Sequence, residues 1–504
     1  MAAAAKTRRM TTRRGENLFT GAGLLRGECS GRAGDQKAQV AFSLYDWHPS
    51  DDTPGEPGDR PSFAPKAVSM MRKLLLLAYH FPPLTTSGMY RSLEFARFLP
   101  EFGWEPLVLT VRPETMREPG ILDPQPLGLL SPGTRIERTS DVQPLQAALR
   151  LRNRFAGGGE GQPAPPASAA LAEEPPDWRD WISDLFSLPD RQVGWFPGAA
   201  AAALGLLERE TVSAIYSSSP PASGHLAALA ASRLSGVPWV ADFRDPWVTN
   251  DFVPLRRTGF LDPIDRCLEG RVVSDADRLV LNTEELRSDF RERYPDLAWK
   301  FVTIPNGFDP EEEIPRPNGP SGTRPFTITH AGTLYGHRDP TPILEALSAL
   351  VARGDLRPSE IRLRFLGSVA GPERWSPAFA AGPLSESVRF EPKVARADAL
   401  RALASSDLLL LIQTGTELQV PRKLFEYLAV GKPILALVSG GATENLLRKD
   451  GLAEIVHPDR REEIERAILR AVRGAAPPSP GRPARFDFRN LTRDLVGLLE
   501  EVAR

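Results

Sequence analysis

Short apolar runs alternate with amphipathic helical patterns along most of this chain, and that alternation restricts its fold more than any other feature. Runs such as Leu74–Tyr79 and Leu107–Val111 suit buried strands, and residues 91–102 between them have helical periodicity. A strand, a helix and a strand in series require a crossover connection, so the strands must lie parallel in one sheet. The pattern predicts an α/β fold with doubly wound parallel sheets.

The alternation occurs in two series, which predicts two domains. The first continues through expected strands at residues 214–217, 239–242 and 279–281. After a Pro- and Glu-rich stretch the second series supplies five more expected strands: Phe326–Thr329, Ile361–Leu366, Val388–Phe390, Leu408–Ile412 and Ile434–Val438. Ligands of such sheets bind beyond the carboxyl ends of the strands, where the strand order reverses. Two Rossmann-like domains that face a shared cleft are therefore expected.

Composition suggests where the segments begin and end. The expected parts are a disordered N-terminal extension, a first Rossmann-like domain, a flexible insertion within it, a linker, a second Rossmann-like domain, and a C-terminal tail with a helix. The extension covers residues 1–68, and the first domain covers 69–309 with the insertion at about 155–176. The linker covers 310–325, the second domain 326–475, and the C-terminal tail with its helix 476–504. The sequence leaves the docking of the last helix, expected over Phe486–Val502, open.

Charge and cysteine content narrow the function classes. Lys and Arg total 62 against 64 Asp and Glu, without the basic surplus of nucleic-acid-binding proteins. Cys29 and Cys267 are the two cysteines, which excludes a disulfide framework and a cysteine-rich zinc site and fits a reducing cytoplasm. No apolar run approaches the roughly 20 residues that span a bilayer. A cytoplasmic protein is expected, at most peripherally associated with the inner face of the membrane, with no nucleic acid as partner.

The most informative segment covers residues 420–433. Pro421 suits the beginning of a helix and Gly431 its end. The N-terminus of a helix offers free backbone N–H groups and a positive dipole end, which suit a diphosphate. Lys423 adds a cation in the first turn, and Glu426 can accept two hydrogen bonds from a ribose diol. The alternative interpretation is an exposed ion pair between Lys423 and Glu426 on an ordinary helix.

Polar residues also follow strands of the first domain. Gly88 lies in a strand-to-helix loop, where a glycine lets backbone N–H groups approach a phosphate or sugar, unless it marks a plain tight turn. Arg244 could hold an anion or orient Asp245, and either Asp242 or Asp245 could contact the donor or acceptor sugar. For Asp242, a buried Asp–Arg pair that braces the loop is the alternative. His225, at the start of a helix, is either functional or an ordinary structural histidine.

In the second domain Gly332, Thr333, Tyr335 and Arg338 follow the first strand. Arg338 is expected to clamp the diphosphate in a bidentate manner, and a solvated surface arginine is the competing interpretation.

Metal ligands are not evident. Asp275 and Asp277 form an Asp-x-Asp motif, but it precedes a strand, on the side away from the ligand edge of a doubly wound sheet. We interpret it as polarity at a helix end. No other cluster has convincing ligand spacing, so neither a metal nor a cofactor is expected.

Six short motifs at the expected strand ends belong together. They are Tyr79-His80-Phe81-Pro82-Pro83 with Gly88, Ser218-Ser219-Pro220-Pro221 with His225, Trp239 to Trp247, Ile304 to Asp309, His330 to Tyr335, and Pro421-x-Lys423-x-x-Glu426-Tyr427-Leu428. In number and order they resemble the GT-B-fold glycosyltransferases of family 4, of the group 1 type, over roughly residues 72–472. The resemblance implies a retaining, metal-independent enzyme that uses a nucleotide-diphospho-sugar. It also implies that the first domain lies on the acceptor side and that the second binds the nucleotide sugar.

The resemblance also implies roles for individual residues. Catalytic roles are expected for Asp245, His225, Lys423 and Arg338. Donor contacts are expected from Gly88, Gly332, Thr333, Arg338, Lys423, Glu426 and Glu417.

One position departs from the family. The common signature has two glutamates separated by seven residues, and the second matches Glu426. The position of the first is Leu418, and Glu417 lies one place away. Either a bulge brings Glu417 to the sugar, or this branch works without that carboxylate.

We therefore expect a hexosyltransferase-like enzyme of polysaccharide biosynthesis for the cell envelope, which transfers a sugar to a glycan or lipid-linked acceptor. A nucleotide-sugar epimerase of the same fold and a catalytically silent nucleotide-sugar-binding subunit are the alternatives, and the absent glutamate favours the second. Four aromatic residues could form a platform for a lipid-linked glycan or could equally be packing: Trp178, Trp181, Trp195 and Phe196.

Overall fold

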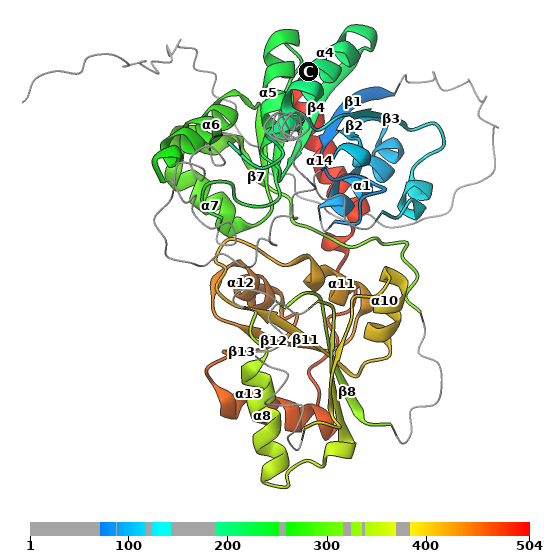
Figure 1. The fold of residues 1–504 in the computed structure, drawn as a ribbon, viewed down its shortest axis with the longest axis vertical. Helices are drawn as coiled ribbons and strands as arrows, with labels where there is room; N and C mark the ends of the chain where they lie inside the picture. Colours follow the sequence, from blue (N-terminus) through cyan, green and yellow to red (C-terminus); the bar gives the residue numbers. More distant parts are fainter. Residues whose placement is uncertain are drawn as a thin grey trace, which may run out of the picture. The chain divides into compact units, whose positions relative to one another are not determined.

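The computed structural model describes most of the chain from residue 71 onward. The described ranges are 71–86, 88–116, 122–142, 185, 187–250, 259–315, 324–334, 338–368 and 384–503. The expected N-terminal extension and flexible insertion, Tyr335, Trp178 and Trp181 lie outside them. Within these ranges the chain forms two parallel sheets with helices between the strands (Figure 1). This is the α/β architecture that the alternating pattern predicted.

The first sheet has seven strands in the order β3-β2-β1-β4-β5-β6-β7, and every neighbouring pair is parallel. The order reverses between β1 and β4, which is the doubly wound arrangement. The strands are β1 (Arg72–Ala78), β2 (Trp104–Val111), β3 (Arg135–Thr139), β4 (Val212–Ser219), β5 (Trp239–Phe243), β6 (Arg278–Leu281) and β7 (Phe301–Thr303).

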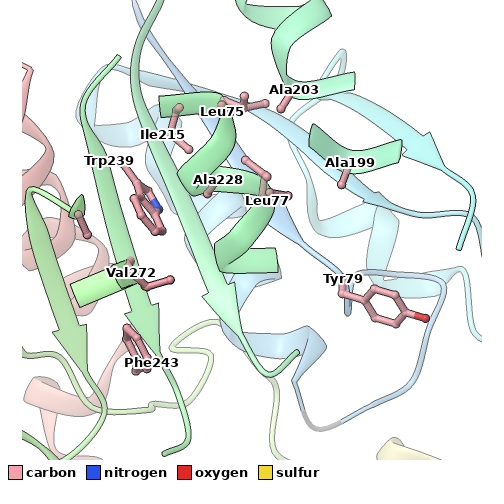
Figure 2. Packing of buried hydrophobic residues seen from close by; sticks show 14 of the residues in the cluster. Leu75, Leu77, Tyr79, Ala199, Ala203, Ile215, Ala228, Trp239, Phe243 and Val272 are labelled. Atoms are coloured by element: carbon pink, nitrogen blue, oxygen red, sulfur yellow. The ribbon is translucent and has the colours of Figure 1, made fainter. Parts of the chain in front are cut away.

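Helices cover both faces of this sheet, so the central strands are apolar on both sides. In β1, Leu75 and Leu77 belong to one buried cluster, whereas Leu74 and Leu76 belong to another. Figure 2 shows the first cluster, where Leu75 and Leu77 lie close to the helix that carries Ala228. The helices are α1 (Met89–Phe98), α4 (Phe196–Arg209), α5 (Ser223–Ser235), α6 (Asp262–Asp275) and α7 (Glu284–Arg293).

The second sheet has six strands in the order β10-β9-β8-β11-β12-β13, again parallel, and it reverses between β8 and β11. The strands are β8 (Phe326–Ala331), β9 (Ile361–Leu366), β10 (Val388–Glu391), β11 (Leu408–Gln413), β12 (Ile434–Val438) and β13 (Glu454–Val456). The helices are α8 (Thr341–Ala352), α10 (Arg396–Ala404), α11 (Arg422–Val430), α12 (Gly441–Asp450) and α13 (Arg461–Val472).

The last helix, α14 (Phe488–Val502), packs on the first sheet rather than the second. Its apolar residues Leu491, Leu495 and Leu499 join the buried cluster that contains Leu74. It lies beside α1 (Figure 1). The C-terminus therefore completes the core of the first domain, which answers the docking question that the sequence left open. No described helix is both long and apolar enough to cross a membrane.

Candidate active site

A cavity of 530 Å³ lies at the loops that follow the strands, and residues of both domains line it. The first domain contributes Arg244, Asp245, Asn250 and Asn306. Several of the second domain's lining residues are polar or charged: Thr333, Arg338, Lys393, Gln413, Gln419, Arg422, Lys423 and Glu426. Most of the predicted donor contacts therefore share one cavity.

The helix α11 begins at this cavity. Pro421 is its N-cap residue and Arg422 its first residue, so the predicted start is off by one position. No side chain caps this end, and Gly431, with a φ of 70°, ends the helix as predicted. The uncapped N-terminus and the cations of its first turn make this end of the helix suited to an anion.

Lys423 is a buried cation in the first turn. Its Nζ lies 3.1 Å from Nε2 of His330, and Nδ1 of His330 lies 3.0 Å from the carbonyl oxygen of Leu410. An ammonium can only donate, so Nε2 accepts from Lys423 and Nδ1 donates to Leu410. Burial, together with the charge of Arg338, holds the pKa of Lys423 well below its usual value.

The turn after β8 approaches Lys423 closely. Gly332 has a φ of 127°, a conformation that other residues rarely adopt. A Cβ built on Gly332 would lie 2.8 Å from Nζ of Lys423. Gly332 and its neighbour Thr333 both line the cavity.

Arg338 lines the same cavity and is only 8% exposed. Its Nε donates to Oε1 of Gln413 at 2.9 Å, and Nε2 of Gln413 donates to Thr416 at 2.7 Å. This chain of hydrogen bonds fixes the guanidinium, so the competing interpretation of a solvated surface arginine is wrong.

Glu426 pairs with two arginines. Its Oε1 accepts from Arg396 at 2.6 Å and lies 3.0 Å from Arg422. Burial raises the pKa of Glu426, but the charges of Arg422 and Arg396 outweigh it, and the pKa lies below its usual value. Glu426 is therefore an ionised carboxylate at the cavity, and within the described residues it forms ion pairs with these arginines rather than with Lys423.

The structure places Asp242 away from the cavity. Both of its carboxylate oxygens accept from Arg91, at 2.8 Å each, and Oδ2 also accepts from Tyr216 at 2.7 Å. Asp242 and Arg91 are 0% and 1% exposed. The bracing ion pair weighed as the alternative for Asp242 is confirmed, with Arg91 from α1 as the partner.

Arg244 and Asp245 line the cavity from the first domain. Nη2 of Arg244 lies 3.5 Å from Oδ2 of Asp245. Gly88 stands directly behind this arginine, because a Cβ on Gly88 would lie 2.0 Å from Nη1. Gly88 therefore makes room for the Arg244 side chain, a contact that the loop prediction did not include.

His225 does not reach the cavity. It is 0% exposed, its Nδ1 lies 2.7 Å from Oγ of Ser217, and its ring packs against Phe243 with 4.6 Å between the centroids. Burial lowers the pKa of His225 to about 3. The imidazole is a neutral part of the core, which does not fit the expected catalytic contact; the structural interpretation fits instead.

The segment before α11 corrects the expectation for Glu417. Glu417 is exposed and does not line the cavity, whereas Leu418 packs against the core of the first domain and accepts a hydrogen bond from Thr283 through its carbonyl. No bulge turns Glu417 inward. Gln419, one position on, lines the cavity in its place, 3.5 Å from the amide of Asn250.

The structure also shows the surroundings of Trp195 and of the Asp-x-Asp motif. Trp195 is completely buried and its Nε1 donates to Thr139, so it packs in the core and offers no platform. Asp277 accepts from the backbone of Trp239, and Asp275 ends α6 beside Arg233, which fits the interpretation as helix-end polarity.

Sequence reasoning missed five cavity residues that bear on binding. Gln413 ends β11, so the strand-end rule could have found it. The others have no motif of their own: Asn250, Lys393, Gln419 and Arg422.

Both domains match known sequence families. Residues 90–307 match the glycosyl transferase 4-like domain, and residues 325–473 match the glycosyl transferases group 1 domain. The chain belongs to the GT-B glycosyltransferases of group 1. No curated protein matches this glycosyltransferase in sequence.

Solved structures share the fold of this glycosyltransferase. HepE of Anabaena in complex with UDP superposes with a TM-score of 0.55 at 15% identity, over 86% of this chain and 100% of that one. Sucrose-phosphate synthase of Thermosynechococcus elongatus gives 0.56 at 14% identity, over 86% and 99%. A structure from E. coli titled for trehalose-6-phosphate and bound with UDP-2-fluoro glucose gives 0.56 at 16%, over 85% and 99%.

Proposed function

We propose that this glycosyltransferase binds a nucleoside-diphospho-sugar in the cavity and transfers the sugar to a hydroxyl group of a glycan or lipid-linked acceptor. The observation that carries the proposal is the buried amino group of Lys423, which faces the cavity from the first turn of α11. A desolvated cation at an uncapped helix N-terminus suits a diphosphate, because the ligand supplies the missing negative charge. Arg338 adds a second cation held by Gln413.

Glu426 supports a contact to the ribose. Arg396 and Arg422 hold one oxygen of its carboxylate and keep the group ionised. An ionised carboxylate has about four acceptor sites, so it can still accept hydrogen bonds from a ribose diol. One turn of helix separates Glu426 from Lys423, a spacing that suits a nucleoside joined to its diphosphate.

The transfer breaks the bond between the anomeric carbon and the diphosphate oxygen. Positive charge develops on the sugar ring and negative charge on the departing diphosphate, while the acceptor oxygen forms the new bond and loses its proton to an oxygen of the departing diphosphate. Lys423, Arg338 and the N–H groups that begin α11 stabilise the leaving group. Asp245 lines the cavity from the first domain and is the carboxylate we propose to contact the sugar or the acceptor.

Retention of configuration and independence from metal are part of the proposal and rest on the family resemblance. The cations of the cavity support independence from metal, since they can neutralise the diphosphate charge that a divalent metal would otherwise neutralise. UDP and UDP-2-fluoro glucose are the ligands of two structures of the same fold. We therefore propose a UDP-sugar as the donor to test first.

A panel of UDP, GDP, ADP and TDP, each titrated into the full chain by calorimetry, tests donor binding. We expect one of these nucleoside diphosphates to bind and to raise the melting temperature. Absence of binding across the panel would remove the proposed donor site.

The position of Glu417 outside the cavity favours one alternative, a subunit that binds the nucleotide sugar without turning it over. Incubation of the enzyme with the matching nucleotide sugar and an acceptor panel separates the possibilities. Transfer supports our proposal, and binding without consumption of the donor supports the silent subunit. Conversion of the donor alone into its sugar epimer, detected by chromatography, supports an epimerase.

A further inference from the structure

The loop after β5, residues 244–250, brings Asp245 to the cavity without helix or strand structure of its own. Such a loop places a side chain accurately only where neighbouring elements fix its backbone. Its beginning is fixed in this way. The backbone N–H of Arg244 donates to the carbonyl oxygen of Ser219 at 3.1 Å, and the side-chain amide of Asn282 donates to the carbonyl oxygen of Arg244 at 2.9 Å.

Two carboxylates hold the second half of the loop. Oε2 of Glu269, from α6, accepts the backbone N–H of Val248 at 3.2 Å. Oδ2 of Asp289, from α7, accepts the hydroxyl of Thr249 at 3.3 Å. Neither carboxylate lines the cavity. Glu269 and Asp289 can therefore influence a bound substrate only through the loop that they hold.

Arg293, the last residue of α7, lies between the two carboxylates. Its Nη2 donates to Oδ2 of Asp289 at 2.6 Å, and its Nη1 pairs with Oε1 of Glu269. The hydroxyl of Tyr294 donates to the same oxygen of Glu269 at 2.8 Å. Glu269 is 0% exposed, and a buried carboxylate is costly unless it is paired and hydrogen-bonded. Arg293 and Tyr294 thus satisfy one oxygen of Glu269, and the other oxygen holds the loop.

We propose that Glu269 is a positioning residue for sugar transfer. Supported by Arg293, it fixes the loop at Val248, and the anchored loop holds the carboxylate of Asp245 at the cavity. A displacement of about 1 Å in a group that contacts the substrate can lower turnover about a hundredfold. The inference rests on the proposed function for the contact between Asp245 and the substrate, whereas the anchoring of the loop does not depend on it.

Glu269→Gln in the full chain tests this role. The glutamine keeps the shape of the side chain but replaces one acceptor oxygen by an NH₂ group, which cannot accept from either Val248 or Arg293. Thr249→Val removes the hydroxyl of the second anchor, and it takes the place of Glu269→Gln should that variant fail to fold. The matched control is Glu292→Gln, which changes an exposed residue of α7 outside the cavity.

Three measurements follow the substitution: transfer kinetics, calorimetric titration of UDP and hydrogen exchange of peptides that cover the loop. The kcat of Glu269→Gln should fall about tenfold or more, and that of Thr249→Val a few-fold. Affinity for UDP should stay within about twofold, because Lys423 and Arg338 are unchanged. Hydrogen exchange in the loop should become about tenfold faster in Glu269→Gln, since a hydrogen bond to a charged acceptor is lost.

A double-mutant cycle with Asp245→Asn separates positioning from a purely structural role. If Glu269 acts through Asp245, the double variant Asp245→Asn/Glu269→Gln should have a kcat within about twofold of that of Asp245→Asn alone. A purely structural role would instead lower the melting temperature of Glu269→Gln and leave the kcat of the folded protein unchanged.

Unchanged kcat in the folded Glu269→Gln and Thr249→Val variants would overturn the proposal. So would losses of kcat that multiply in the double variant, because Glu269 would then act independently of Asp245. Failure of the proposed function looks different: the wild type binds no nucleoside diphosphate and transfers no sugar. Faster exchange of the loop in Glu269→Gln would still support its anchoring by Glu269 in that case.

Discussion

Nζ of Lys423 lies 3.1 Å from Nε2 of His330, and this contact joins the first turn of α11 to the end of β8. The histidine anchors the ammonium without neutralising it, because Nε2 is an uncharged acceptor. Burial and the nearby Lys423 hold the pKa of His330 well below its usual value, which keeps the ring in this form. The pair thus holds the amino group of Lys423 at the cavity, where burial and the charge of Arg338 lower its pKa and the charge of Glu426 raises it.

Replacing Lys423 by Met should lower the turnover of the donor but raise the stability of the free protein. We expect turnover of the donor to fall about a hundredfold or more, the scale of losing one charge-stabilising group. We also expect a higher melting temperature without ligand, because a buried charge is replaced by an apolar side chain of similar length. Donor assays and thermal denaturation measure the two effects, and Lys449→Met, on an exposed part of α12, is the control.

The same substitution should alter the dependence of stability on pH. The folded-state pKa of Lys423 is lowered, whereas that of an unfolded lysine is about 10.4. Between these values the unfolded state binds more protons, so the stability of the wild type rises with pH in that window. Lys423→Met should lack this rise. A variant that keeps both the pH slope and near-normal turnover would show that Lys423 has neither role.

Glu426→Gln tests the assignment of the ribose contact. The substitution removes the charge but keeps the shape, so affinity for UDP should fall about tenfold, as expected for the loss of hydrogen bonds to a charged acceptor. Affinity for pyrophosphate, which has no ribose, should stay within about twofold, because its contacts are with Lys423 and Arg338. Calorimetric titration of both ligands measures how much the substitution weakens the affinity for each. An equal loss for the two ligands would place Glu426 at the phosphates or give it a purely structural role.

Arg91→Met should destabilise the first domain severely. Asp242 would become a buried carboxylate without its guanidinium, at a cost of about 3 to 5 kcal/mol in the free energy of unfolding. The double variant Arg91→Met/Asp242→Asn should be more stable than Arg91→Met alone, since it removes the unpaired charge. Urea denaturation measures both. A mild effect of Arg91→Met, below about 1 kcal/mol, would mean that water compensates Asp242.

His225→Asn distinguishes a core histidine from a catalytic one. We expect stability to fall by about 1 to 3 kcal/mol, because a buried contact with Ser217 is lost, while kcat at neutral pH stays within a few-fold of wild type. The pKa of His225 is about 3 in the folded chain and its usual value is 6.5, so wild-type stability falls as the pH drops from 6.5 towards 3. The stability of the variant should fall less steeply over this pH range. Part of the fall should remain, because the pKa of His80 is also lowered to about 3.

The contrary result for His225 would be a hundredfold loss of kcat with unchanged melting temperature. It would restore the catalytic role that the sequence suggested.

The central strands were predictable because their signal is local. Ile361–Leu366 and Ile434–Val438 have the predicted bounds. Ile434–Val438 is a continuous apolar run, as expected for a strand covered on both faces, whereas Ile361–Leu366 has arginines between its first apolar residues. The strands that the sequence missed are β3, β7 and β13, which lie at sheet edges. β3 reads RIERT, and charged residues are common on edge strands, where they discourage pairing with other chains. In sequence such a segment resembles a loop, and only its pairing with β2 identifies it as a strand.

The sequence predicted the part of the candidate active site that lies on a single helix, α11. Lys423 and Glu426 share the first turns of α11, so their spacing alone brings them near one ligand. Their partners were not predictable, because His330 and Arg396 come from β8 and α10. Two motif residues, His225 and Asp242, were given possible functional roles that their complete burial does not fit. Glu417, one place from the signature position, is exposed and lies outside the cavity.

The sequence by itself determined the alternation of strands and helices, the two domains and the helix that begins after Pro421, since these depend on neighbouring residues. Only the tertiary structure decided which charges are paired. It joined Arg91 to Asp242 across 151 positions and left Arg244 with one distant partner. Burial and electrostatic energy depend on distance in space, and a sequence specifies that distance only through the completed fold.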